Sequence, residues 1–279
     1  MRTFGKILLA LIILAAAVAA AAGYFLIYTR TSDDNLKPHH YANAVEDDDS
    51  FESKGKTGET LFELNRKKIK KTGSHYIENF ELIWQMPELP TGCEITSLTM
   101  VLRYLGTDAD KVDIARGYLI KEDVTCDENE KYYGPDFRYT FAGDPEGDTS
   151  YGCMAPCIVR TAQRYIADGE YQLSPVNLSG SGFDDLLDYV EHDVPVIIWS
   201  TMELVEPEYK AKWRTPDNKE VVWPSNEHCV VLTGYDADEG TVRTHDPMNG
   251  VLTLDMGAVC TRYEQLERNA VIIVKGKNG

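Results

Sequence analysis

The sequence predicts an α+β domain whose helices come first and whose strands come last. Apolar residues recur at three-to-four spacing over residues 93–105 and again over residues 155–166, which is the period of an amphipathic helix. From residue 194 onward the apolar runs are short and are separated by turn residues, which is typical of strands. Because helices and strands are segregated along the chain, we expect an α+β fold with segregated halves.

Residues 76–279 are predicted to form one domain. The chain has 279 residues, and the roughly 200 that follow the N-terminal segments are enough to bury a sizeable core. The formal net charge of the chain is −17. Because nucleic-acid phosphates are bound by basic patches, this charge argues against a nucleic-acid partner.

The N-terminal segment is typical of a membrane anchor or an export signal. Arg2 and Lys6 precede an uncharged apolar run over residues 7–28, which is long enough to cross a bilayer as a helix. The positive flank predicts a cytoplasmic N-terminus, with the rest of the chain outside. A cleaved signal peptide is the alternative, because small residues at 20–22 offer a cleavage site. Since the apolar run continues past them, a single-pass anchor within residues 1–28 is favoured.

A polar tether is predicted between this segment and the domain. The tether covers residues 29–75, of which residues 29–50 contain too little apolar surface to fold alone and end in a run of acidic residues, while a short helix is expected around residues 61–69. Apolar residues then alternate loosely over residues 80–84, which predicts a short strand at the start of the domain.

The middle of the domain is predicted to hold two helices and one long insertion. The helices cover residues 93–105 and 111–118, and the second is expected to be capped by Asp108 or Asp110. Residues 121–152 are rich in Gly, Asp, Pro and aromatic residues and show no helical or strand period. We therefore expect a long surface insertion there.

Two more helices and a series of strands are predicted for the remainder. The helices cover residues 155–166 and 183–191, and the second is expected to begin at Ser179 or Ser181. The strand segments are residues 194–199, a hairpin within 213–223, and residues 229–235, 241–245, 251–254 and 270–274.

The cysteine spacing predicts neither a metal site nor a cofactor site. Six cysteines lie at positions 93, 126, 153, 157, 229 and 260. A structural zinc site needs two close pairs, whereas only Cys153 and Cys157 lie near each other in the sequence. In an exported protein, a disulfide from Cys126 to either Cys153 or Cys157 is a possibility.

Cys93 is the candidate nucleophile. It lies at the start of the predicted helix, where unpaired N–H groups and the positive end of the helix dipole favour a thiolate. The same N–H groups would stabilise an oxyanion formed on a substrate carbonyl. A buried cysteine that only packs is the alternative interpretation.

His228 and Asp246 are the candidate partners of this thiol. Folding the two predicted strands about the turn at residues 236–240 brings positions 234 and 240 opposite each other, and likewise His228 and Asp246, within a residue of register. A carboxylate beside an imidazole fixes its tautomer and stabilises the imidazolium. His245 is the competing base, but it precedes Asp246 in a strand and is expected to face the opposite side.

Gln85 is a candidate for the oxyanion site. It lies eight residues before Cys93, in the loop that leads into the helix. Its amide N–H groups would complement the backbone N–H of Cys93. A surface glutamine without such a role is the alternative interpretation.

Four segments together resemble the C-thirty-nine-like cysteine peptidases, which are relatives of the bacteriocin-processing double-glycine leader peptidases. These segments are PELPTGCEITSL at 87–98, VPVIIW at 194–199, EHCVVLTGYD at 227–236 and DPMNG at 246–250. They occur in the family's order, and the resemblance covers most of residues 80–275.

The resemblance implies a papain-like fold, with the nucleophile helix packed on an antiparallel sheet. It implies Cys93 as nucleophile, His228 as general base and acid, Asp246 as the orienting carboxylate and Gln85 as oxyanion donor. The expected function is an extracytoplasmic cysteine peptidase acting on a peptide or protein. The alternatives are a thiol acyltransferase or amidase on cell-envelope peptides, or a non-catalytic binding module on the same fold.

Overall fold

The computed structural model describes residues 73–276 of the chain. The membrane anchor or signal peptide predicted at residues 1–28, and almost all of the tether predicted at 29–75, lie outside these residues. Among the residues that the structure describes, no helix is long and apolar enough to span a bilayer.

The helices of the described region agree closely with the sequence prediction, except for the last. They are α3 (Cys93–Tyr104), α4 (Lys111–Gly117), α5 (Ala155–Asp168), α6 (Phe183–Glu191) and α7 (Met256–Gln265), with a 3₁₀ turn η1 (Met202–Leu204). The side chain of Asp110 accepts the N–H groups of Val112 and Asp113, so this predicted cap of α4 is confirmed. The cap predicted for α6 is wrong, because that helix begins after Gly182, whose N–H is accepted by Asp185.

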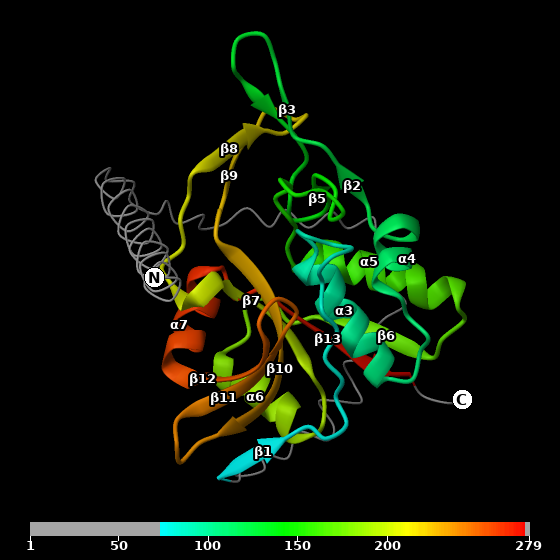
Figure 1. Ribbon diagram of the computed structural model, residues 1–279, viewed down its shortest axis with the longest axis vertical. Coiled ribbons are helices and arrows are strands. Elements are labelled where there is room, and N and C mark those ends of the chain that lie inside the picture. The colour runs from blue at the N-terminus through cyan, green and yellow to red at the C-terminus, as the bar shows by residue number, and fades with distance from the viewer. Residues whose placement is uncertain (1–72, 277–279) are drawn as a thin grey trace, which may run out of the picture. The chain divides into compact units, whose positions relative to one another are not determined.

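One antiparallel sheet forms the centre of the fold (Figure 1). Its strand order is β12-β11-β10-β7-β13-β6, with β1 paired to β10 as well. The bounds are β1 (Ser74–Tyr76), β6 (Leu173–Asn177), β7 (Val196–Thr201), β10 (Glu227–Asp236), β11 (Thr241–Asp246), β12 (Gly250–Asp255) and β13 (Ala270–Lys275). All six residues of β7 are buried, and so are all but the last of β10, so both faces of these central strands are covered.

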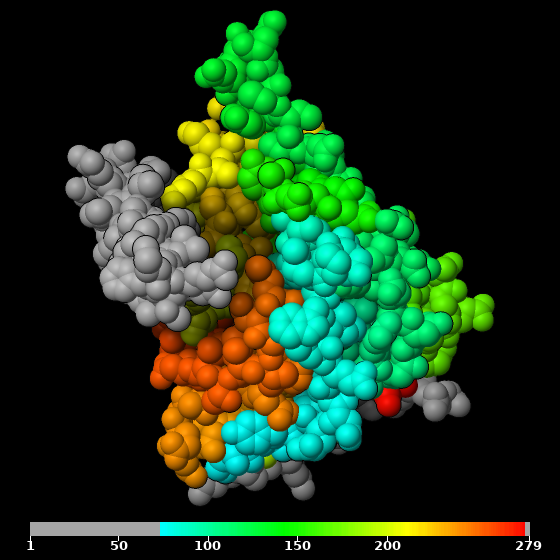
Figure 2. Space-filling model, viewed as in Figure 1, coloured from blue at the N-terminus to red at the C-terminus, as the bar shows by residue number. Residues whose placement is uncertain are grey.

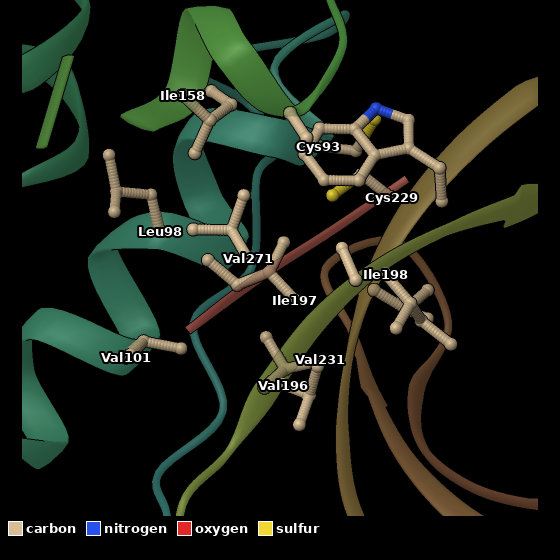
Figure 3. Packing of buried hydrophobic residues seen from close by; sticks show 14 of the residues in the cluster. Cys93, Leu98, Val101, Ile158, Val196, Ile197, Ile198, Cys229, Val231 and Val271 are labelled. Atoms are coloured by element: carbon tan, nitrogen blue, oxygen red, sulfur yellow. The ribbon is translucent and has the colours of Figure 1, made fainter. Parts of the chain in front are cut away.

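Helix α3 packs against β10 and forms one side of the core. Its apolar residues Ile95, Leu98 and Val101 are fully buried, and Figure 3 shows Val101 directed toward the apolar side chains of the sheet. Gly92 precedes the helix at a crowded position, because a Cβ there would lie 2.7 Å from Cβ of Leu89. The predicted α+β class, with the helix that begins at Cys93 packed on an antiparallel sheet, is confirmed.

The segment predicted as an insertion without regular structure contains four short strands. They are β2 (Lys121–Glu122), β3 (Thr125–Cys126), β4 (Tyr132–Tyr133) and β5 (Phe141–Ala142). Strands β3 and β4 join β8 (Ala211–Arg214) and β9 (Glu220–Trp223) in a second sheet, which extends away from the main one (Figure 1). The side chains of β5 are fully buried. Strands of two residues are too short to leave a period in the sequence.

The strand predicted at residues 80–84 is wrong, because this segment is irregular. Its apolar residues anchor a loop. Phe80 is buried with its ring centroid 4.8 Å from that of His245 and 5.3 Å from that of Tyr104. The elements β6 and α7 were not expected from the sequence.

The disulfide considered for Cys126 is also wrong, because all six cysteines are free thiols. Cys126 is exposed on β3, whereas Cys153 and Cys157 are buried at the start of α5.

Candidate active site

A cavity of about 300 Å³ brings together three of the residues predicted from the sequence. Cys93, His228 and Gln85 all line it. The remaining lining residues are Pro90, Thr91, Ser150, Tyr151, Met202, Trp223, Ser225, Glu227 and Met248. Figure 2 shows a recess on the corresponding face, where the more distant gold atoms of the β9–β10 region lie between the cyan segment that leads into α3 and the orange strands. The walls therefore come from segments that lie far apart in the sequence.

Cys93 is the first residue of α3 and is only 7% exposed. The helix is held to the sheet next to this residue, because the hydroxyl of Ser97 donates to the carbonyl of Cys229 at 3.2 Å. Figure 3 shows Cys93 and Cys229 at the same end of the apolar cluster. Packing of α3 on β10 thus places Cys93 close to the strand that carries His228.

His228 and Asp246 form a buried hydrogen-bonded pair, as expected. Nε2 of His228 lies 2.8 Å from Oδ1 of Asp246. Asp246 also accepts the backbone N–H groups of Met248 and Asn249 at 2.7 and 3.0 Å. Burial alone would raise the pKa of Asp246, but these hydrogen bonds and His228 lower it to about 2. The carboxylate therefore holds the proton of His228 on Nε2, which leaves Nδ1 for a contact in the cavity.

The strand register that brings this pair together differs from the predicted one. Gly234 pairs with Arg243, and Val231 pairs with His245, because the β10–β11 ladder shifts between residues 232 and 234. His228 itself lies opposite Ser200 of β7. The side chains of His228 and Asp246 nevertheless meet at the shared end of the two strands.

His245, the competing base, does not line the cavity of Cys93. Its Nδ1 lies 2.9 Å from the hydroxyl of Thr233. Burial and the nearby Arg243 lower the pKa of His245 to about 4, so the ring is neutral at neutral pH. The expectation that His245 faces away from Asp246 is met.

Gln85 reaches the cavity from a loop that is held at several points. Its side chain is 1% exposed, and Nε2 donates one hydrogen bond to the carbonyl of Pro90 at 2.8 Å. The second N–H of this amide is not used in that bond. The backbone N–H of Gln85 donates to Pro247 at 2.9 Å, which ties the loop to the turn after Asp246.

Lys111 also holds this loop in place, a role that was not predicted from the sequence. Its ammonium group donates to the carbonyls of Trp84 and Gln85 and lies 2.7 Å from the carboxylate of Glu88. The side chain is only about a tenth exposed, although it carries a charge. Lys111 therefore fixes the backbone from which Gln85 extends.

Replacing Lys111 by methionine is expected to lower the free energy of unfolding by about 1–3 kcal/mol, because two buried carbonyl groups lose a charged donor. Urea titration followed by circular dichroism would measure the change. Lys121→Met is the matched control. Its ion pair with Asp144 is more exposed, so the expected loss is below about 1 kcal/mol. Equal losses in the two variants would contradict the role given to Lys111.

Two buried carboxyl groups beside Cys93 were not singled out from the sequence. Glu94 follows Cys93 and is fully buried, and Glu227 precedes His228 and is 8% exposed. Oε2 of Glu94 accepts the thiol of Cys93 at 3.4 Å, and its Oε1 accepts the backbone N–H of Cys153 at 2.7 Å. In the sequence, Cys93 and His228 each have a charged neighbour, and this was the only signal for Glu94 and Glu227. Their burial follows from the tertiary fold and has no local sequence pattern.

These neighbours change the expected ionisation of Cys93. Burial, followed by the charges of Glu94 and Glu227, raises the pKa of the Cys93 thiol well above its usual value. Although α3 begins at Cys93 as predicted, the helix terminus is not sufficient to keep a thiolate in the resting site. Attack on a substrate therefore requires a group that takes the thiol proton.

Cys93, Glu94 and Glu227 also offer ligand atoms that all lie within 4.8 Å of one another. One thiol and two carboxyl groups are donors that a divalent cation accepts. In the described structure, however, Glu94 is already hydrogen-bonded to both Cys93 and Cys153. We therefore interpret the cluster as a set of groups that share protons.

The described domain is similar to known proteins. The sequence profile of the Peptidase C39 like family matches residues 77–271. The uncharacterized protein YvpB of Bacillus subtilis strain 168 is 29% identical over 190 residues, which are 68% of this chain and 71% of YvpB. A crystal structure assigned as a C39-like peptidase from Bacillus anthracis superimposes with a TM-score of 0.64 at 26% identity, covering 74% of this chain and all of that one.

A double glycine motif protease from an AMS/PCAT transporter, solved with a leader peptide, is more distant. Its TM-score is 0.36 at 16% identity, and the match covers 73% of this chain and 99% of that protease. The family profile covers well over half of the chain, and it includes Cys93, His228 and Asp246. This chain belongs to the Peptidase C39 like family.

Proposed function

We propose that this chain is a cysteine peptidase that hydrolyses peptide or amide bonds with Cys93 as nucleophile, His228 as acid and base, and Asp246 as the orienting carboxylate. The observation that carries the proposal is the shared cavity of Cys93 and His228, with the His228 ring fixed by a 2.8 Å bond to Asp246. Membership of a peptidase family supports the same chemistry.

Hydrolysis would proceed through an acyl-enzyme. The Cys93 thiolate attacks the substrate carbonyl, and the imidazolium of His228 protonates the leaving amine. His228 then takes a proton from the water that attacks the thioester. The free N–H of Gln85 and the N–H groups at the start of α3 are the donors that would stabilise the oxyanion at each stage.

The cavity lining favours a peptide substrate. Trp223 and Tyr151 supply aromatic surface, and Met202 and Met248 are about 40% exposed at the rim. Apolar and aromatic walls with a few polar groups are typical of sites that bind a side chain next to a reacting bond. We therefore propose an apolar side chain near the scissile bond.

We also propose that the domain acts outside the cytoplasm. The support is the apolar run at residues 7–28 with its basic flank at Arg2 and Lys6. A membrane-anchored domain would act on peptides or proteins at the cell surface. Cysteine-accessibility labelling of intact cells with a membrane-impermeant reagent, read at the exposed Cys126, would test this placement.

The reactivity of Cys93 tests the catalytic proposal directly. Iodoacetamide at neutral pH is expected to alkylate Cys93 faster than the buried Cys157, since only the first lines a cavity beside an imidazole. His228→Ala is expected to slow labelling of Cys93 by about tenfold or more, because the thiolate loses its cationic partner. Tryptic mapping by mass spectrometry would measure both rates. Labelling of Cys93 at the rate of an unactivated thiol would contradict the proposal.

A further inference from the structure

We propose that Glu94 is a further catalytic residue, which accepts the thiol proton of Cys93 and returns it at the end of each turnover. This inference rests on the proposed function, because it requires Cys93 to be the nucleophile. It adds a proton acceptor that is separate from His228.

The contacts of the Cys93 thiol point to Glu94. In the part of the chain that the structure describes, the thiol donates to Oε2 of Glu94 at 3.4 Å and makes no hydrogen bond to His228. The other oxygen of Glu94 is fixed by the N–H of Cys153 at 2.7 Å. The carboxyl group is thus held at both ends, with one oxygen directed at the reacting sulfur.

The fold also reserves space for this carboxyl group. Gly152 has φ +146°, and a Cβ at this position would lie 2.5 Å from Oε1 of Glu94. A side chain there would displace the carboxyl or strain the backbone. The approach of the 150–153 segment to Glu94 therefore depends on a glycine.

Burial makes Glu94 a group that changes protonation near neutral pH. The titratable groups that face it are Cys93 on α3, Cys153 with its neighbour Cys157 at the start of α5, and Glu227, His228 and Cys229 on β10. Burial raises the pKa of Glu94 to about 7. Burial and the charge of Glu94 raise the pKa of Glu227 well above its usual value.

With this assignment, Cys93, Glu94 and His228 each regain their starting protonation state at the end of one turnover. The reactive form of the site holds a Cys93 thiol, a Glu94 carboxylate and a His228 imidazolium. The thiol proton moves to Glu94, the thiolate attacks the carbonyl, and His228 gives its proton to the leaving amine. In the second half, His228 takes a proton from water, the thioester C–S bond breaks, and the released thiolate recovers its proton from Glu94.

The reactivity of Cys93 is expected to depend on pH, because Glu94 accepts the thiol proton only when it is itself unprotonated. When Glu94 is itself protonated at low pH, it has no capacity for the thiol proton. Reactivity of Cys93 is therefore expected to rise as pH increases through about 7 and to level off above it. Between about pH 6 and pH 8 a single ionisation with this midpoint gives about a tenfold rise.

The test measures alkylation of Cys93 by iodoacetamide from about pH 5.5 to pH 8.5 in the full chain, with EDTA present so that no cation occupies the site. Because iodoacetamide is uncharged, the profile reports the protein groups. Glu94→Gln keeps an oxygen for the N–H of Cys153 but has no capacity to accept a proton. The midpoint near pH 7 is expected to disappear, and the rate at pH 8 is expected to fall by about tenfold or more.

Glu227→Gln is the matched comparison, since it replaces the other buried carboxyl group of the cluster, whereas the thiol of Cys93 donates to Glu94. Its midpoint is expected to move by less than about half a pH unit. A profile in Glu94→Gln that coincides with that of the unmodified chain overturns the role of Glu94 while leaving Cys93 as nucleophile. A larger shift in Glu227→Gln than in Glu94→Gln also overturns it.

Two further outcomes keep the inference separate from the proposed function. If Cys93 labels no faster than an unactivated thiol at any pH, the proposed function itself fails, and the role of Glu94 fails with it. If Glu94→Gln does not fold, infrared titration of the unmodified chain decides. A buried carboxylic acid band that disappears at the labelling midpoint supports the inference, and its absence overturns it.

Discussion

Replacing Cys93 by alanine is expected to abolish peptide hydrolysis while leaving the fold intact. The sulfur is the only atom that forms a bond to the substrate in the proposed mechanism, so its removal eliminates the acyl-enzyme. In an enzyme that acts through an equivalent triad, loss of the nucleophile costs on the order of 10⁶-fold in turnover. The structural change is small, because the hydrogen bond that the thiol donates to Glu94 is long, at 3.4 Å.

A mixed peptide library incubated with the full chain, with products identified by mass spectrometry, would measure this loss. The free energy of unfolding is expected to fall by no more than about 1–2 kcal/mol, since only one buried sulfur is removed. Cys157→Ala is the matched control, because Cys157 is also buried but does not line the cavity. Hydrolysis that survives in Cys93→Ala on a substrate cleaved by the unmodified chain would refute the assignment of the nucleophile.

The sequence was most informative where local patterns determine structure. Helix α3 begins and ends within a residue of its predicted bounds, because apolar periodicity and the Gly-Cys boundary are local signals. The β10–β11 hairpin was likewise marked by its polar turn. The pairing register of the two strands was not predicted, because the irregularity between residues 232 and 234 depends on how both strands pack against their neighbours.

Nonlocal packing explains the elements that were missed. Phe80 belongs to an apolar run that was expected to be a strand, but its ring packs against His245 and Tyr104 from a loop. Strands β3 and β4 exist because β8, some 80 residues later, completes their sheet, so no local pattern marks them.

The site was predicted in outline, but its electrostatics were not. Cys93 and His228 were identified by residue type, by position and by resemblance to a family. The helix terminus was expected to favour a thiolate, whereas burial beside Glu94 and Glu227 has the opposite effect. A sequence contains Glu94 and Glu227 as two charged residues, and only the fold shows that they share a buried site with a thiol.

Replacing Asp246 by asparagine is expected to lower the rate of hydrolysis by about 10²–10⁴-fold, less than the loss of Cys93. Asparagine retains the shape of the side chain and an acceptor for the N–H groups of Met248 and Asn249. It has no charge to stabilise the His228 imidazolium, and its amide allows the ring to adopt the wrong tautomer. The decrease should appear in kcat rather than in KM, because Asp246 acts through His228 and does not line the cavity.

The same substitution has a second, independent consequence for stability. The pKa of Asp246 is lowered to about 2 in the folded chain from an ordinary value of 3.8. A lowered carboxyl pKa stabilises the fold above the unfolded pKa, and this contribution is lost as pH falls from about 4 toward 2. Asp246→Asn should therefore cost about 2 kcal/mol at neutral pH and progressively less below about pH 4. Urea titrations of both chains at neutral and acidic pH would measure the difference. A cost that does not vary with pH would mean that the buried pair of Asp246 and His228 is not ionised as the hydrogen-bond geometry implies.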